Sequence, residues 1–467
     1  MNLPPGLSRL TLLLLVFAFP AQGGVLAQRA PGEQSSSNVH VLSHLPVARG
    51  PNQSGYQELL DIDVEQELSR PYVYISHLID YDGFDIISVK DPKRARMMYQ
   101  WQIENPELRP GISGAFNPRY FKLKGRYYVA LCFQYRPGGP DSDLGAIIFD
   151  VTGLPDTTKV KEVGRIRAPD TPGGFHNLFP YKHSDGRVLL FTTTTAPKAN
   201  IYDMDKFLSG DAKQGLIGEI PNGPEEGRVI KNSGYHDMYV AYDPATHQDK
   251  FYGPGLANGY FVYDVSRPEE PKLLTSMTGI AGQAVAHTFQ ATPDGRYGVT
   301  QMEYQYAPLR IFDLKPGLDG TVKTISRPIG AWHASSDGWR KASHNHQIRW
   351  PYIFVASFDD GLQVLNMMDP TNPYTVGYWD TQDGPDLQGL DLVTAGPGNT
   401  IFTGAWGIQV RNADGLIVVS DFKTGFWAFH MDGFDGWNGH QWGMPNISAA
   451  QDWDNGPEGA PKTAKVS

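Results

Sequence analysis

Four histidines recur at one position of a repeated sequence pattern, and imidazole nitrogens are common ligands of transition metals. They are His176, His236, His287 and His344, and a fifth histidine, His346, follows the last of them. Three or four neutral imidazoles suit Cu²⁺, Fe²⁺ or Zn²⁺, and an open coordination position would permit catalysis, with oxidation as the reaction we expect first. The set therefore predicts a site for one divalent transition-metal ion.

Polar residues directly follow two of these histidines. Asn177 comes after His176, and Asp237 comes after His236. A hydrogen bond to the second ring nitrogen fixes the tautomer and orientation of a metal-bound imidazole. We therefore predict that Asn177 and Asp237 lie behind the ligands and orient them.

The repetition of histidine also has an explanation that requires no metal. Tandem duplication copies a residue whether or not it binds anything, and a histidine can cap the start of a strand through a hydrogen bond. No aspartate or glutamate is tied to the four histidines by a regular spacing. Two functions stay open, a binding or scaffold protein and a metal-dependent enzyme. A protonated cluster that binds an organic anion is a third alternative.

The elements that position the histidines repeat about every 57 residues. Each copy contains an apolar strand that ends near a polar residue, and these polar residues are Ser88, Asp150, Asp203, Asp264, Asp313, Asn366 and His430. Four short apolar runs separated by turn residues make up a copy, as expected for one propeller blade. The sequence therefore predicts an all-β fold, a seven-bladed β-propeller.

Within their copies the histidines hold equivalent places. Each lies 22 to 28 residues before the polar residue of its own copy, at the start of the innermost strand. That position is near the mouth of the central channel, where propellers commonly bind ligands. Phe116 and Trp406 occupy comparable places in the second and last copies. We expect Trp406, and the aromatic pair Trp332 and His333 before the sixth blade, to contact a ligand.

The two ends of the repeat region predict how the ring closes. The last copy is one outer strand short, and the run 38–46 near the N-terminus belongs to no copy. An N-terminal strand in the last blade would close the ring and cover an exposed sheet edge. We expect a single domain over 38–433, followed by a tail over 434–467 that is rich in glycine and proline and contains tryptophans.

The first residues resemble a secretory signal. Arg9 precedes an apolar run of about ten residues, which is too short for a helix that spans a bilayer, and small residues follow it. We expect residues 1–27 to be a signal peptide, and the protein to be periplasmic or extracellular without a transmembrane segment. The single cysteine, Cys132, allows no internal disulfide, and its strand-like surroundings predict a buried side chain.

The formal net charge of −10 opposes binding to nucleic acid, which needs a concentrated positive field. The partner is therefore expected to be a ligand or a protein on the channel face. The repeated hairpins, several followed by an Asp-Pro pair as in Asp91-Pro92 and Asp369-Pro370, resemble those of LVIVD-repeat propellers, including the choice-of-anchor B group. This resemblance covers nearly all of the chain after the signal, and it implies an exported propeller.

Overall fold

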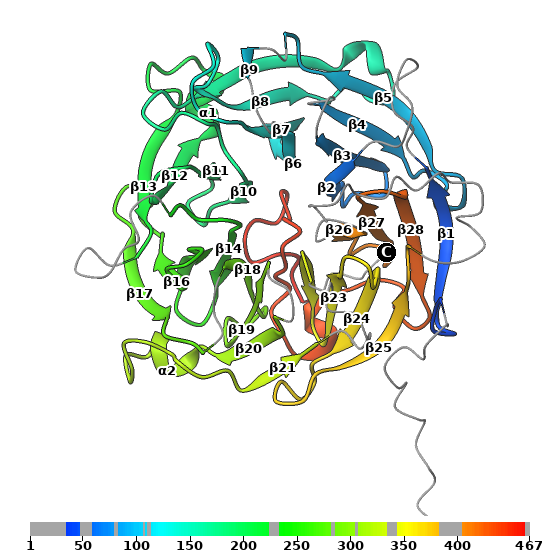
Figure 1. The fold of residues 1–467 in the computed structure, drawn as a ribbon, viewed down its shortest axis with the longest axis vertical. Helices are drawn as coiled ribbons and strands as arrows, with labels where there is room; N and C mark the ends of the chain where they lie inside the picture. Colours follow the sequence, from blue (N-terminus) through cyan, green and yellow to red (C-terminus); the bar gives the residue numbers. More distant parts are fainter. Residues whose placement is uncertain are drawn as a thin grey trace, which may run out of the picture.

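The computed structural model describes residues 34–46, 58–78, 83–105, 108–109, 114–223, 233–281, 285–303, 307–333, 343–382 and 404–462. Its strands form seven four-stranded antiparallel blades around a central axis (Figure 1). Blades 1 and 2 join into one sheet through a single pair, Leu78 with Gly114. The predicted seven-bladed β-propeller is confirmed.

The strands follow each other blade by blade. Blades 1 to 3 contain β2 (Glu58–Val64), β3 (Tyr72–Leu78), β4 (Gly83–Ser88) and β5 (Arg96–Gln102); β6 (Gly114–Leu123), β7 (Arg126–Gln134), β8 (Leu144–Asp150) and β9 (Lys161–Arg167); and β10 (Leu178–Lys182), β11 (Val188–Thr193), β12 (Lys198–Asp203) and β13 (Leu216–Pro221). Blades 4 and 5 contain β14 (Tyr239–Asp243), β15 (Gln248–Pro254), β16 (Tyr260–Asp264) and β17 (Lys272–Met277); and β18 (Ala286–Ala291), β19 (Tyr297–Met302), β20 (Leu309–Asp313) and β21 (Gly330–Trp332).

Blade 6 contains β22 (His346–Arg349), β23 (Tyr352–Ala356), β24 (Leu362–Asn366) and β25 (Tyr374–Trp379), and blade 7 contains β26 (Ala405–Val410), β27 (Ile417–Asp421) and β28 (Gly425–Met431). The strand β1 (Val39–Leu45) pairs antiparallel with β28 as the fourth strand of blade 7. Short helices lie in the connections: α1 (Met204–Leu208), α2 (Lys315–Leu318), η1 (Pro92–Arg94), η3 (Thr157–Lys159) and η5 (Gly439–Trp442).

The first strand of each blade lines the channel, and the last lies at the rim (Figure 1). Each inner strand contacts the inner strand of the next blade around the ring. All seven inner strands therefore begin at the same end of the channel, which we call the mouth. Buried apolar side chains of neighbouring blades pack against each other and form the hydrophobic core.

Backbone hydrogen bonds link neighbouring blades directly beside the mouth. The amide of Phe175 donates to the carbonyl of Phe133 at 2.8 Å, and the amide of Ala405 donates to the carbonyl of Phe358 at 2.9 Å. Gly174 permits the first link, because its φ is +78° and a Cβ there would lie 1.9 Å from the Phe133 oxygen. This glycine therefore places His176 at a fixed distance from blade 2.

We predict that Gly174→Ala destabilises the protein by about 3 kcal/mol or more, because the new Cβ adds a backbone clash to an unfavourable φ. The matched control is Gly125→Ala, where φ is +75° but no atom lies within 4 Å of the added Cβ. That variant should lose only about 1 kcal/mol. Urea denaturation measures both, and equal losses would show that the close approach at Gly174 carries no cost.

The C-terminal segment packs across the channel end opposite the mouth (Figure 1). The indole Nε1 of Trp437 donates to the carbonyl of Trp350 at 2.9 Å, just after β22 ends. Trp437 and Trp453 are buried, whereas Trp442 is 42% exposed. The expected tail from residue 434 is thus, as far as residue 462, a closely packed part of the molecule.

The expected signal peptide, residues 1–27, lies outside the described residues. Within the described part of the chain, no helix is long and apolar enough to cross a membrane.

Candidate metal centre at the channel mouth

Seven side chains, one from the start of each inner strand, surround the mouth, and we call them the mouth ring: Leu60, Phe116, His176, His236, His287, His344 and Trp406. From Phe116 to Trp406, the centroids of successive rings are 5.0, 4.1, 4.0, 4.4 and 4.0 Å apart. Leu60 packs in one apolar cluster with Trp406 and Phe116. The structure therefore places four of the five predicted imidazoles side by side.

The Nδ1 atom of each of these imidazoles meets an oxygen of the protein. His236 faces the Asp237 carboxylate at 3.0 Å, and His344 faces the carbonyl of Trp406 at 3.0 Å. His287 faces the Thr288 hydroxyl at 2.7 Å, and His176 faces the amide oxygen of Gln134. A carbonyl or carboxylate only accepts, so Nδ1 of His236 and His344 carries the proton. The hydroxyl of Thr288 has the Asp237 carboxylate and the backbone carbonyl of His344 as acceptors for its single proton, so it accepts from Nδ1 of His287.

This assignment leaves a lone pair on the Nε2 atom of each neutral imidazole. Nε2 of His287 and His344 is buried and has no hydrogen-bond partner among the described residues. The carboxylate of Glu303 faces these atoms: its oxygens lie 3.6 Å from Nε2 of His236 and 3.8 Å from Nε2 of both His287 and His344. Lone pairs and a carboxylate that converge in this way are the donor set of a cation site.

The distances fit ligands of a single ion. One ligand atom each from His236, His287 and Glu303 lies within 4.8 Å of the others, and His176, His236 and Asp237 form a second such group. Ligands at about 2 Å from one shared ion are separated by about 3 to 4 Å. A small inward movement of these side chains would therefore bring them to bonding distance of a metal.

Burial keeps most of these imidazoles in the neutral, ligating form. It lowers the pKa of His344 to about 3 and the pKa of His287 and His176 well below the usual value. Burial also acts to lower the pKa of His236, but the hydrogen bond and charge of Asp237 outweigh it and leave that pKa raised. Burial raises the pKa of Glu303. The cluster at neutral pH is therefore not a set of imidazolium ions neutralised by one carboxylate.

A polar ring lies one residue further along the inner strands and holds Asp237 in place. Asn177 donates to Asp237 at 2.6 Å, and Thr288 donates to it at 3.1 Å. On the other side Asn345 donates to Asp61 at 2.9 Å. Asn177 thus contacts Asp237 and not its neighbour His176, whose Nδ1 partner comes from β7. Of the two predicted orienting residues, Asp237 touches an imidazole directly and Asn177 supports Asp237.

Asp61 gives this polar ring a dependence on pH. Burial and the nearby charge of Asp237 raise the pKa of Asp61 to about 7 in the folded protein, against about 3.9 for an unfolded aspartate. The folded state binds this proton more tightly, so the free energy of unfolding falls as the pH rises from about 4 to about 7. We predict that Asp61→Asn removes about 2 to 4 kcal/mol of that fall.

Denaturation of chelator-treated protein between pH 4.5 and 8 measures this effect. The parent and Asp61→Asn should have similar stability at the acidic end, and the variant should be more stable at pH 8. Asp435→Asn is the control, because its side chain is 88% exposed. Parallel stability curves for the parent and Asp61→Asn would contradict the prediction.

The remaining predicted site residues lie elsewhere. His346 occupies the place that Leu178 and Met238 hold in blades 3 and 4, where its Nδ1 contacts Gln301 of the neighbouring blade. Trp332 lies in β21, the rim strand of blade 5, and its Nε1 donates to Thr375 at 3.0 Å; His333 follows it and is exposed. Trp332 and His333 therefore lie at the rim of blade 5 and away from the mouth ring, and their contact with a ligand stays a prediction.

Glu303 was missed because it occurs in one blade and not in the repeat. The hairpin of blade 5 could have located Glu303 from the sequence, because β18 begins beside the end of its antiparallel partner β19. The register pairs Ala286 with Met302, which sets Glu303 beside the start of β18 and thus near His287. An acidic residue directly after the second strand of a blade is therefore a candidate to lie beside the histidine at the start of that blade's first strand.

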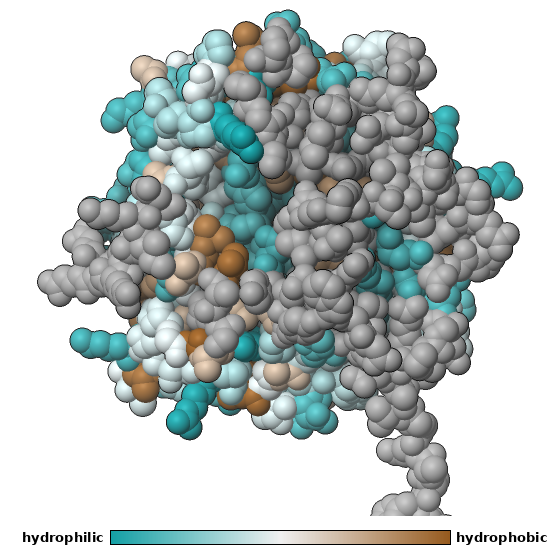
Figure 2. All heavy atoms as spheres, in the orientation of Figure 1, coloured by the Kyte–Doolittle hydropathy of each residue, from teal (hydrophilic) through white to brown (hydrophobic). Residues whose placement is uncertain are grey.

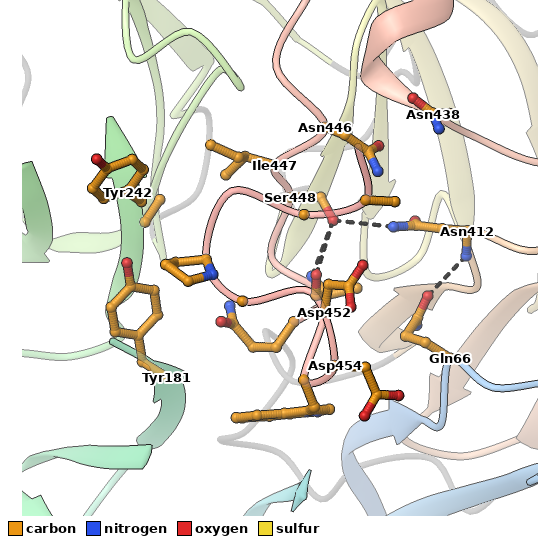
Figure 3. Close-up of a pocket in the computed structure, with 18 of the residues that line it drawn as sticks. Gln66, Tyr181, Tyr242, Asn412, Asn438, Asn446, Ile447, Ser448, Asp452 and Asp454 are labelled. Atoms are coloured by element: carbon orange, nitrogen blue, oxygen red, sulfur yellow. Dashed lines mark hydrogen bonds between the residues drawn. The ribbon is translucent and has the colours of Figure 1, made fainter. Parts of the chain in front are cut away.

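A separate cavity of about 310 Å³ lies at the opposite end, between the C-terminal segment and the inner-strand ends (Figure 3). Tyr181 and Tyr242 lie on one side of it. Asn412 donates through its side chain to Ser448 at 3.3 Å and through its backbone amide to Gln66 at 2.8 Å. The first of these bonds attaches the C-terminal segment to blade 7. The described lining contains neither histidine nor cysteine, and its carboxylates belong to Glu67, Asp452 and Asp454.

The same fold occurs among solved structures of low sequence identity. The crystal structure of the WD40 β-propeller domain of Doa1 matches with a TM-score of 0.51 and 10% identity, over 85% of this chain and 99% of that chain. The chain is a β-propeller. No family model and no curated protein matches it, so the resemblance to LVIVD-repeat propellers is not confirmed. A propeller is suited to binding or scaffolding, and the mouth ring must carry any more specific argument.

Proposed function

We propose that this propeller is a binding protein whose mouth ring holds one divalent transition-metal ion, copper, iron or zinc. His236, His287, His344 and Glu303 are the proposed ligands, and His176 flanks them. The observation that carries the proposal is the convergence of imidazole lone pairs on the partly buried carboxylate of Glu303. The two buried Nε2 atoms of His287 and His344 face Glu303, and neither has a hydrogen-bond donor among the residues that the structure describes.

The protein's own residues prepare this site before the ion arrives. Asp237, Thr288 and the carbonyl of Trp406 set the proton on the far nitrogen of three imidazoles, so each presents its lone pair at the same end of the channel. Glu303 supplies negative charge where burial would otherwise disfavour a cation. A metal with an open position would supply Lewis-acid or redox chemistry there.

The expected location is part of the proposal. A copper-, iron- or zinc-binding propeller outside the cytoplasm agrees with the signal-like features of residues 1–27 and with a chain that contains one buried cysteine. Expression of the full chain with a fused reporter, followed by fractionation, tests this location. Retention of the unprocessed chain in the cytoplasm would contradict it.

Elemental analysis tests the metal. Protein purified without chelators, and chelated protein reloaded separately with Cu²⁺, Fe²⁺ or Zn²⁺, should contain about one equivalent of at least one of these ions after desalting. Less than about 0.1 equivalent of every ion would exclude the metal centre and leave binding without a metal as the function of the channel face.

A further inference from the structure

The mouth ring has two chemically different halves. Blades 3 to 6 contribute the imidazoles, and blades 7, 1 and 2 contribute Trp406, Leu60 and Phe116. The apolar half is backed by further aromatic rings, since the centroid of Trp406 lies 5.7 Å from that of Phe358 and 5.5 Å from that of Phe422. A metal-binding half therefore faces an apolar half across one channel.

The order of blades in the ring fixes what lies opposite the metal centre. In a closed ring of seven, blade 1 and its neighbours lie across the axis from blades 4 and 5, which carry His236, His287 and Glu303. A molecule bound to the ion and extending across the channel would thus approach this apolar half. Leu60 and Trp406 are buried, whereas Phe116 is half-buried, so contact with Phe116 would remove apolar surface from water.

Among the described residues, the side of the site toward the mouth is partly exposed, and the C-terminal segment lies on the other side. The side chains of His236 and Glu303 are 13% and 17% exposed, and Phe116 is half-buried. Figure 2 shows one face of the propeller hollowed near its centre, with hydrophilic residues in the hollow. At the other end Ala449 of the C-terminal segment lines the same small internal cavity as Asn177 and Asp237. A ligand would therefore reach the ion past Phe116 and the partly exposed rings of His176 and His236.

We infer that the metal centre takes a small organic ligand that has a nitrogen or oxygen donor on an apolar, aromatic-sized body, with Phe116 as its main specificity contact. This inference rests on the proposed metal site. It extends that proposal, because a site that binds only a metal ion would need no apolar side chains opposite the metal ligands. Small inorganic anions would coordinate the ion without using the apolar half.

The test compares two probes that share one donor group, imidazole and 4-phenylimidazole. Each is titrated into Cu²⁺-loaded full-length protein while the visible absorption of the metal is followed. The parent should bind 4-phenylimidazole at least about tenfold more tightly than imidazole, because burial of part of the phenyl ring adds to the same metal bond. Phe116→Ala should reduce that ratio below about threefold.

The control variant is Phe207→Ala, which shortens a half-buried phenylalanine in α1 that packs against Gly164 of β9. It should retain the tenfold ratio. Protein that holds one equivalent of metal but binds both probes equally would overturn this inference and leave the metal site standing. An unchanged ratio in Phe116→Ala would overturn the role of Phe116. Protein that holds no metal would overturn both this inference and the proposed function.

Discussion

Replacing both His236 and His287 with alanine is expected to reduce the bound metal from about one equivalent to less than about 0.1 after desalting. Two of the four proposed ligands are lost, and the Nε2 atoms that remain do not surround an ion. The affinity should fall by well over the 10- to 100-fold that follows loss of an outer hydrogen-bond partner. Elemental analysis and competition with a chromophoric chelator measure the stoichiometry and the affinity.

His346→Met is the matched control for this variant. His346 is also buried, but it faces a neighbouring blade at the place where blade 4 carries Met238, so methionine fits there. This variant should retain one equivalent of metal with an unchanged affinity. If it lost the metal while the double variant kept it, the assignment of ligands would be wrong.

Trp437→Ala is expected to lower the free energy of unfolding by about 3 to 5 kcal/mol. The indole is 2% exposed, packs with the apolar cluster of blades 6 and 7, and donates to the carbonyl of Trp350. Its removal leaves a cavity and a carbonyl without its donor at the end of the channel. Urea denaturation followed by circular dichroism measures the change.

Trp442→Ala separates this effect from a general intolerance of the C-terminal segment to substitution. Trp442 lies five residues further on and is 42% exposed, so its loss should change stability by less than about 1 kcal/mol. A C-terminal segment that is only loosely attached predicts small effects for both variants. That result would contradict the packing described at this end of the channel.

Sequence periodicity carried most of the information about the fold. The polar residues chosen from the repeat end the third strands of blades 1 to 6, as at Asp150, Asp264 and Asn366. Because that position recurs, the offset back to the inner strand also recurs, and it located four histidines at one level of the channel. A blade is a local unit, so a pattern within about 60 residues suffices to define it.

The pattern could not predict features that occur once or depend on packing between distant segments. Glu303 belongs to one hairpin, and only the register of β18 with β19 relates it to His287. His346 stands two residues from His344, but it lies within β22 and not before it, and there its Nδ1 contacts Gln301 of the neighbouring blade. The C-terminal segment has no repeat of its own, and its place depends on contacts such as that of Trp437 with Trp350.

The most direct test of the metal centre is a crystal structure of the metal-loaded protein with anomalous diffraction data collected at the absorption edge of the bound metal. The account predicts one strong anomalous peak at the channel mouth, about 2.0 to 2.3 Å from Nε2 of His236, His287 and His344 and from a carboxylate oxygen of Glu303. A peak that lies away from these atoms, or none at the mouth in protein containing one equivalent of metal, would contradict it.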